Sequence, residues 1–105
     1  MTYTVLWSKS AEKSLDKIVE FYGLVANKKV AHHIAQKILL SSISLENYPK
    51  RCQTEPSLSH LSTEYRYLLV GHHKIIFSII EDADIVQIQT VFDCRQNPAK
   101  LEAGI

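Results

Sequence analysis

Five histidines are the first residues in this chain to suggest chemistry, because four of them form two adjacent pairs. The pairs are His32-His33 and His72-His73, and His60 stands alone. A zinc site needs three or four ligands that converge on one point. Adjacent strand residues point to opposite faces, so His72 and His73 do not readily hold one ion together. We expect turn and surface histidines, with no metal and no cofactor.

The two cysteines, Cys52 and Cys94, are the other candidates for chemistry. A catalytic thiol needs a neighbouring base and an oxyanion hole. His72 is within reach of Cys94 across a predicted hairpin, but nothing around Cys94 resembles a nucleophile elbow. Two cysteines also do not make a disulfide framework. We interpret both as free thiols without a catalytic role.

The charge distribution argues against a dedicated nucleic-acid binder. The 105 residues carry a net charge of +1, which combines +4 in residues 1–52 with −3 in residues 53–105. Nucleic-acid binders usually show a concentrated basic surface, whereas this mild excess is typical of solvated helix faces. No stretch approaches the ~18–20 apolar residues of a membrane span. The first residues do not resemble a signal peptide, so we expect a cytoplasmic protein.

Two helices are expected after a short first strand over residues 3–7. Ser8 is a candidate N-cap for the first helix and Asn27 for the second, since their side chains accept bonds from unpaired amides. Gly23 is expected to end or loosen the first helix, and Tyr48-Pro49 to stop the second. Apolar residues at helical spacing define one face of each helix: Ala11, Leu15, Ile18, Val19 and Tyr22, then Val30, Ala31, Ile34, Ala35, Ile38, Ser42 and Leu45.

Three more strands are predicted after an irregular segment over residues 50–63. They cover residues 65–70, 73–80 and 85–93, with a tight turn at Gly71-His72, and residues 99–103 form a short helix or a frayed tail. The order is β-α-α-β-β-β. The simplest packing is a single α+β domain over residues 1–105, in which a two-helix hairpin covers one face of an antiparallel sheet.

The expected register divides the strand residues between two faces of the sheet. If Ile80 lies opposite Ile85, then Phe77 lies opposite Ile88. The same register pairs Ile79 with Val86 and Ile75 with Thr90. This core face would also carry Phe92, and it would pack under four helix residues, which are Leu15, Ile18, Ile34 and Ile38.

The opposite face mixes apolar and polar side chains. It is expected to carry Tyr65, Tyr67, Leu69, Lys74, Ile76, Ser78, Gln87, Gln89, Val91 and Asp93. A monomer should not leave such a surface bare. Arg66 falls on the helix side, where a buried arginine must be paired. We expect a structural ion pair with Glu20 or Asp16, and the alternative is a functional cation at the sheet edge.

Three segments carry a family resemblance. They are VLWS-x-x-A-x-x-x-L-x-x-I over residues 5–18, R-x-L-x-V-G-x-x-x-I-x-F over residues 66–77 and VFDCRQNP over residues 91–98. In this order they resemble the RelE/ParE superfamily of toxins from bacterial type II toxin–antitoxin modules, and the second and third resemble its ParE branch. The chain departs from that branch at five positions, with His73 and Phe77 in place of Tyr, Asp93 in place of His, Gln96 in place of Arg and Asn97 in place of Asp.

The resemblance implies one of two activities. ParE-like toxins are associated with poisoning DNA gyrase, and RelE-like toxins cut messenger RNA on the ribosome. Where RelE-like proteins place lysines, this chain has Tyr65 and Tyr67, and where they place an arginine it has Lys74. The nuclease alternative would rely on Lys74, Arg95 and Asp93. Two cations without a clear general base are a weak set of groups for catalysing phosphoryl transfer. We favour the gyrase inhibitor, with Arg95, Lys74 and Arg66 as candidate functional cations.

A toxin of this kind also implies a protein partner. We expect the C-terminal segment of a cognate antitoxin to cover the exposed sheet face and part of the second helix. The candidate contacts are Tyr67, Leu69, Ile76, Val91, Leu40 and Ile43. Such a module would serve plasmid stabilisation through growth arrest. A third reading is a degenerate member that binds its antitoxin without being toxic.

Overall fold

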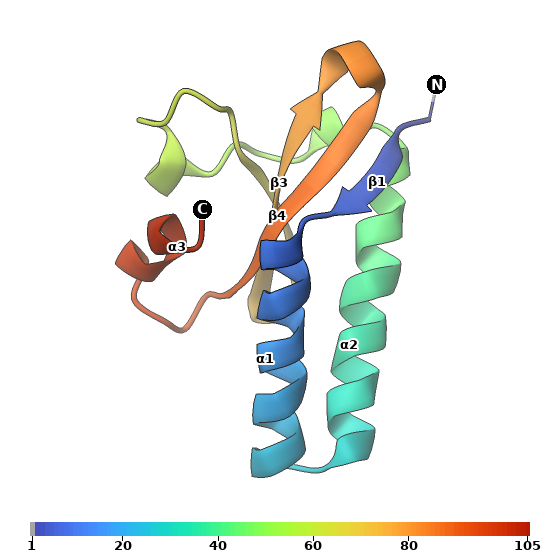
Figure 1. Cartoon of the computed structure of the whole chain (residues 1–105), viewed down its shortest axis with the longest axis vertical. Helices are drawn as coiled ribbons and strands as arrows, with labels where there is room; N and C mark the ends of the chain where they lie inside the picture. The colour runs from blue at the N-terminus through green and yellow to red at the C-terminus, as the bar shows by residue number, and fades with distance from the viewer. Residues whose placement is uncertain (1) are drawn as a thin grey trace.

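The computed structural model describes residues 2–105 as two helices on a four-stranded sheet (Figure 1). The elements follow in the order β1 (Thr4–Trp7), α1 (Lys9–Val25), α2 (Lys28–Ile43), β2 (Arg66–Val70), β3 (His73–Ile80), β4 (Ile85–Asp93) and α3 (Ala99–Ala103). The expected α+β architecture is confirmed. None of the helices in the described residues has the length and apolar composition needed to cross a bilayer.

Both predicted helix caps are present. The Ser8 hydroxyl accepts a hydrogen bond from the Ala11 amide at 3.0 Å, and the Asn27 side chain accepts one from the Val30 amide at 2.9 Å. Gly23 does not end α1, which continues to Val25. The helix hydrogen bonds are simply maintained through the glycine. The second helix differs in the opposite direction, since α2 ends at Ile43, before the expected stop at Tyr48-Pro49.

The sheet is mixed, which corrects the expectation of a purely antiparallel one. Its strand order is β1-β4-β3-β2, and β1 pairs with β4 in parallel. Parallel pairing requires a long connection, and most of the chain separates these two strands. The parallel direction also lets the chain turn at Ser8 and enter α1 directly over the sheet (Figure 1).

The register of β3 and β4 is confirmed in its first half and wrong in its second. Phe77 lies opposite Ile88 as predicted, but the pairing then shifts by one residue. Ile75 therefore lies opposite Val91 rather than Thr90. Gln89 is the extra residue of a β-bulge, which reverses the faces of the residues that follow it. Val91 thus joins the helix side, and Phe92 joins the opposite side.

Two serines of the first turns of α1 hold the bulge in place. Because β1 ends at Trp7, the start of α1 covers the edge of β4 beyond it. The Ser8 hydroxyl donates to the Gln89 carbonyl at 3.0 Å. The Ser14 hydroxyl accepts from the Val91 amide at 2.9 Å. These bonds satisfy backbone groups of β4 that lie beyond the last residue of β1 and have no strand partner on that side.

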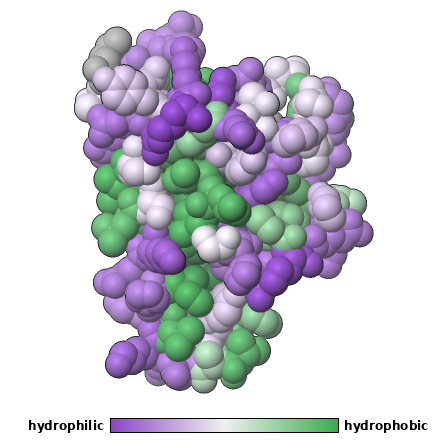
Figure 2. Space-filling view, turned by 180° about the vertical axis from the view of Figure 1, so that it is seen from behind, coloured by the Kyte–Doolittle hydropathy of each residue, from purple (hydrophilic) through white to green (hydrophobic). Residues whose placement is uncertain are grey.

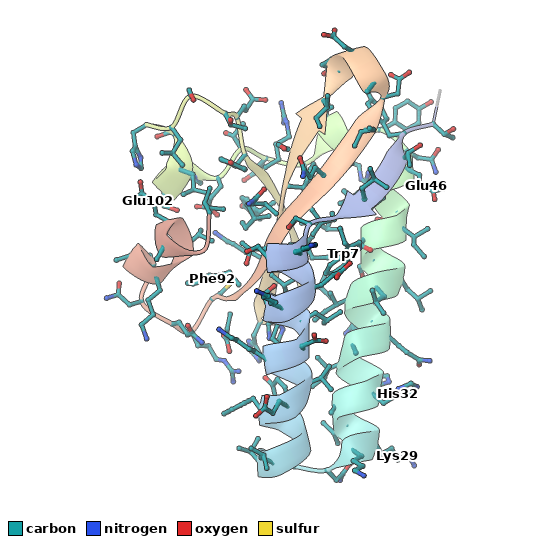
Figure 3. The ribbon with its side chains drawn as sticks, in the orientation of Figure 1. Trp7, Lys29, His32, Glu46, Phe92 and Glu102 are labelled. Atoms are coloured by element: carbon teal, nitrogen blue, oxygen red, sulfur yellow. The ribbon has the colours of Figure 1, made fainter. Side chains whose placement is uncertain are left out.

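Each face of the sheet carries its own apolar core. The helix-side core contains Phe77, Val86 and Ile88 beneath α1 and α2, as predicted, together with Leu15, Ile18, Ile34, Ile38 and Ile79. The second core contains Leu58, Ile76 and Leu101. Segments outside the sheet supply Leu58 and Leu101, so the chain itself covers much of the face that was expected to be exposed. Phe92 lies on the α3 side of β4 (Figure 3).

Candidate functional site

Lys74 lies on the second face and is bound by a buried carboxylate. Its Nζ atom is 2.7 Å from Glu55 Oε1 and 4.3 Å from the centre of the Tyr67 ring. Burial alone would raise the pKa of Glu55, but hydrogen bonds from Lys74 and Ser57 outweigh it and leave that pKa below its usual value. Lys74 is therefore an engaged cation, because its charge already balances Glu55.

The segment over residues 50–63, here called the crossing segment, brings Glu55 to this position. It runs along the outer edge of β2, where the Tyr67 amide donates to the Gln53 carbonyl at 3.1 Å. The Glu55 amide donates to the Tyr65 carbonyl at 2.8 Å. The segment thereby covers part of an edge strand. Sequence reasoning missed Glu55, because nothing local indicates that it reaches across β2 to Lys74.

Arg95 is bound by the end of its own strand and by α1. Its Nε and Nη2 atoms lie 3.0 and 2.8 Å from the two carboxylate oxygens of Asp93. Nη2 also donates to the Tyr22 hydroxyl at 2.8 Å. The hydrogen bonds from Arg95 lower the pKa of Asp93 to about 2. The β-bulge turns Asp93 toward the helix side of the sheet, away from Lys74 on the second face.

Arg66 organises the crossing segment. Its Nη1 atom donates to the Cys52 carbonyl at 2.6 Å, and Nη2 donates to Glu64 Oε1 at 3.0 Å. The predicted partners, Glu20 and Asp16, are wrong. The crossing segment lies against the end of β2 and offers carbonyl oxygens there, so Nη1 and Nη2 are hydrogen-bonded before the guanidinium reaches the helices. The Nε atom is buried without a hydrogen-bond partner in the described residues.

The six residues expected to contact an antitoxin divide into accessible and inaccessible ones. Leu69 on β2 is 58% exposed, and on α2 Leu40 and Ile43 are exposed as well. Tyr67 is half-buried. The expected exposure of Ile76 and Val91 is wrong: the second core covers Ile76, and the bulge turns Val91 toward the helices.

Further exposed apolar side chains gather where α1 meets α2. They belong to Phe21, Leu24 and Val25 at the end of α1. Figure 2 shows apolar surface at this lower end of the molecule. The hairpin therefore presents two apolar areas, one near the sheet on α2 and one at its far end.

The histidines and cysteines are scattered. His60 of the crossing segment lies 2.7 Å from Glu102 of α3, and His73 is buried on β3. Among residues 2–105, no three side chains of the metal-binding types gather. Cys52 and Cys94 are both free thiols, and desolvation raises the pKa of each. A raised pKa disfavours the thiolate that a nucleophile requires.

One hollow was missed by reasoning from sequence. It has a volume of about 590 Å³ and lies between α1, the end of β4 and α3. Lys13, Lys17 and Lys100 line it together with His73. The spacing of Lys13 and Lys17 on one helix face was a visible signal. Their meeting with Lys100 and His73 depends on where α3 packs.

Comparison with known proteins gives a consistent result. Residues 5–98 match the family model described as the ParE toxin of the type II toxin–antitoxin system parDE. Curated proteins give no significant match. Among solved structures, the chromosomal ParDE system of P. aeruginosa has a TM-score of 0.73 at 18% identity, covering 88% of this chain and 96% of that one.

Two further solved structures share the fold at low identity. One is the RelBE2 complex of Mycobacterium tuberculosis, with a TM-score of 0.63 at 18% identity and coverage of 89% of this chain and 92% of that one. The other is the archaeal RelE–RelB complex of Pyrococcus horikoshii, with a TM-score of 0.61 at 14% identity and coverage of 92% and 100%. At these identities the similarity shows a shared fold and nothing more specific.

Proposed function

This chain belongs to the ParE toxin family of type II toxin–antitoxin systems, and from this premise we propose that it inhibits DNA gyrase and is neutralised by a cognate antitoxin. Inhibition of gyrase and neutralisation by the antitoxin would both operate through protein–protein contacts. One observation favours gyrase over messenger RNA as the target. The three candidate cations, Lys74, Arg95 and Arg66, are already bound by carboxylates or carbonyl oxygens of the chain itself.

An RNA-cleaving toxin needs free cationic and acid–base groups. They must activate the 2′-hydroxyl, stabilise the phosphorane and protonate the leaving oxygen. Here Lys74 balances Glu55, Arg95 is bound by Asp93, and Arg66 is directed at carbonyl oxygens. Affinity for RNA also depends on free cations that neutralise phosphates. This arrangement supports inhibition by binding.

Induced expression with two separate readouts tests the choice of target. We expect growth arrest with DNA-damage signalling and intact messenger RNA, together with inhibition of gyrase supercoiling by the purified protein. Rapid ribosome-dependent cleavage of messages would overturn the proposal in favour of a RelE-type endonuclease. Antitoxin binding without growth arrest would identify a degenerate, non-toxic member.

Two substitutions sharpen this test. Lys74→Gln should leave toxicity intact, whereas a nuclease that uses Lys74 should lose roughly 10²–10³ in rate. Arg95→Ala should weaken toxicity, because Arg95 is half-exposed where β4 leaves the sheet. The double variant Lys74→Gln/Glu55→Gln is the control, since it removes the charge of Lys74 without leaving Glu55 unpaired.

The exposed residues of the predicted antitoxin surface are Leu69, Leu40 and Ile43. An antitoxin segment that folds over them would gain about 25 cal/mol per Å² of buried apolar area. Of the solved structures that share this fold, one belongs to a ParDE toxin–antitoxin system and another is the RelBE2 toxin–antitoxin complex, which supports a protein partner for this chain.

Charge substitutions test this placement. Leu69→Glu and Leu40→Glu should each weaken the complex with the antitoxin encoded beside this gene. Leu24→Glu is a matched control, because Leu24 is 80% exposed but lies at the far end of the hairpin. Unchanged affinity in both test variants, measured by calorimetry, would exclude this surface.

A further inference from the structure

The hollow between α1, the end of β4 and α3 has a mixed lining, with an apolar and aromatic part among polar and charged side chains. Ile18, Phe21 and Tyr22 of α1 line it from one side, and Val91 and Phe92 line it from the strand. Aromatic rings bury large areas of apolar surface when a partner covers them. The volume of about 590 Å³ is enough for one or two large side chains.

Hydrogen bonds hold the walls of this hollow in position. The Ser10 hydroxyl donates to the Gly104 carbonyl at 3.2 Å, which ties the end of α3 to α1. The Ser14 hydroxyl accepts from the Val91 amide at 2.9 Å, which ties α1 to β4. A site whose walls are already joined loses less conformational entropy on binding than one that must assemble.

Three unpaired cations surround the hollow. Lys13 and Lys17 lie one turn apart on α1, and Lys100 lies on α3. Within residues 2–105, none of the three forms an ion pair. The one carboxylate that lines the hollow, Asp93, is already bound by Arg95. Like charges one turn apart disfavour each other, so an anion would be attracted here.

A buried histidine supplies an independent sign of a missing partner. His73 is 5% exposed and lines the hollow, and its Nε2 atom has no hydrogen-bond partner in the described residues. Buried polar atoms without a partner are rare in folded proteins. Desolvation lowers the pKa of His73 and favours the neutral ring, which donates from one nitrogen and accepts at the other.

We propose that this hollow binds an acidic segment of a partner protein. An apolar or aromatic side chain of the segment fills the interior, and flanking carboxylates contact Lys13, Lys17 and Lys100. The segment lies against His73, which lines the hollow. The three cations surround one hollow and do not form the extended basic track of a nucleic-acid site. The proposal stands independently of gyrase inhibition, because it concerns binding alone.

Fluorescence anisotropy with a short labelled peptide tests the proposal. The probe alternates glutamate with leucine and phenylalanine, and its counterpart carries glutamine at every glutamate. We expect Lys13→Gln/Lys17→Gln to weaken binding of the acidic probe by about tenfold or more. Lys100→Gln should weaken it less. Lys28→Gln/Lys29→Gln is the matched control, because it removes the same charge at the start of α2.

A second readout locates the bound peptide. The ring nitrogen signals of His73 should shift in NMR spectra when the acidic probe is added, while those of exposed His32 should not. Equal weakening by the control variant would show attraction to net charge alone and would overturn the proposal. Tighter binding of a single-stranded RNA of the same length would also overturn it, as would no peptide binding at about 1 mM.

Discussion

The face of the sheet that packs on α1 and α2 and the face opposite it are built from the same strands but covered differently. The long helices cover the first face with residues at helical spacing, including Ile18 and Ile38. The second face is covered by Leu58 of the crossing segment and Leu101 of α3. These two residues come from short elements whose sequences show no extended periodicity.

The second face also differs from the helix side because it encloses an ion pair. This pair is formed by Lys74 and Glu55, and the Glu55 carboxylate is almost fully buried. A charge can be enclosed in this way only when it is paired and hydrogen-bonded. Much of the second face is therefore covered by a polar and apolar layer, and Leu69 of β2 stays exposed, whereas strand alternation alone predicted an open binding surface over the whole face. The following predictions test how different the two faces are.

The largest expected effect is on the helix side. Phe77→Ala should lower the free energy of unfolding by about 3–5 kcal/mol, because Phe77 is fully buried between the sheet and the helices. Chemical denaturation followed by circular dichroism measures the change. Leu24→Ala, at an exposed position, should stay within about 0.5 kcal/mol of the unaltered protein.

Leu101→Ala should have a smaller effect on the second face. We expect a loss of about 2 kcal/mol, at the lower end of the range for buried leucine, because α3 is short and can adjust around the gap. The same denaturation experiment applies. A loss equal to that of Phe77→Ala would show that both faces form one cooperative core.

Breaking the ion pair on the second face should cost a similar amount of stability, through charge rather than through packing. Lys74→Gln should lower the free energy of unfolding by about 1–3 kcal/mol at neutral pH, because it leaves the Glu55 carboxylate without its cation. The pKa of Glu55 is lowered by folding, so its contribution is present above its unfolded pKa near 4.5 and is lost as the pH falls through the folded value. Glu55→Gln should therefore flatten the acid limb of a stability–pH curve, and an unchanged limb would contradict this assignment.

The smallest effect on stability is expected at the end of β4. Arg95→Ala should return the pKa of Asp93 from about 2 toward its ordinary value of 3.8, because the hydrogen bonds from Arg95 cause the shift. Folding lowers this pKa, so the stability it contributes is lost between about pH 4 and pH 2. Carboxyl-carbon NMR during an acid titration measures it. A pKa that stays near 2 in the variant would assign the shift to other groups.

Much of the architecture was predictable from sequence. Ser8 and Asn27 are helix caps, as their residue types indicate. The alignment of Phe77 with Ile88 follows from alternation on either side of the acidic turn. These features depend on interactions between residues close in the chain, or across one short turn. The family resemblance also lies in such local motifs, and the match over residues 5–98 confirms it.

The candidate site was less predictable, because its contacts join distant parts of the chain. Glu55 meets Lys74 only because the crossing segment runs along β2, and Leu101 covers Ile76 only because α3 folds back. The residues on either side of the bulge at Gln89 bond to Ser8 and Ser14, which the start of α1 brings to the edge of β4. A single inserted residue reverses every later side chain on a strand. Local periodicity and capping thus determined the helices and most of the sheet, whereas long-range hydrogen bonds and charge pairing decided which side chains stayed exposed.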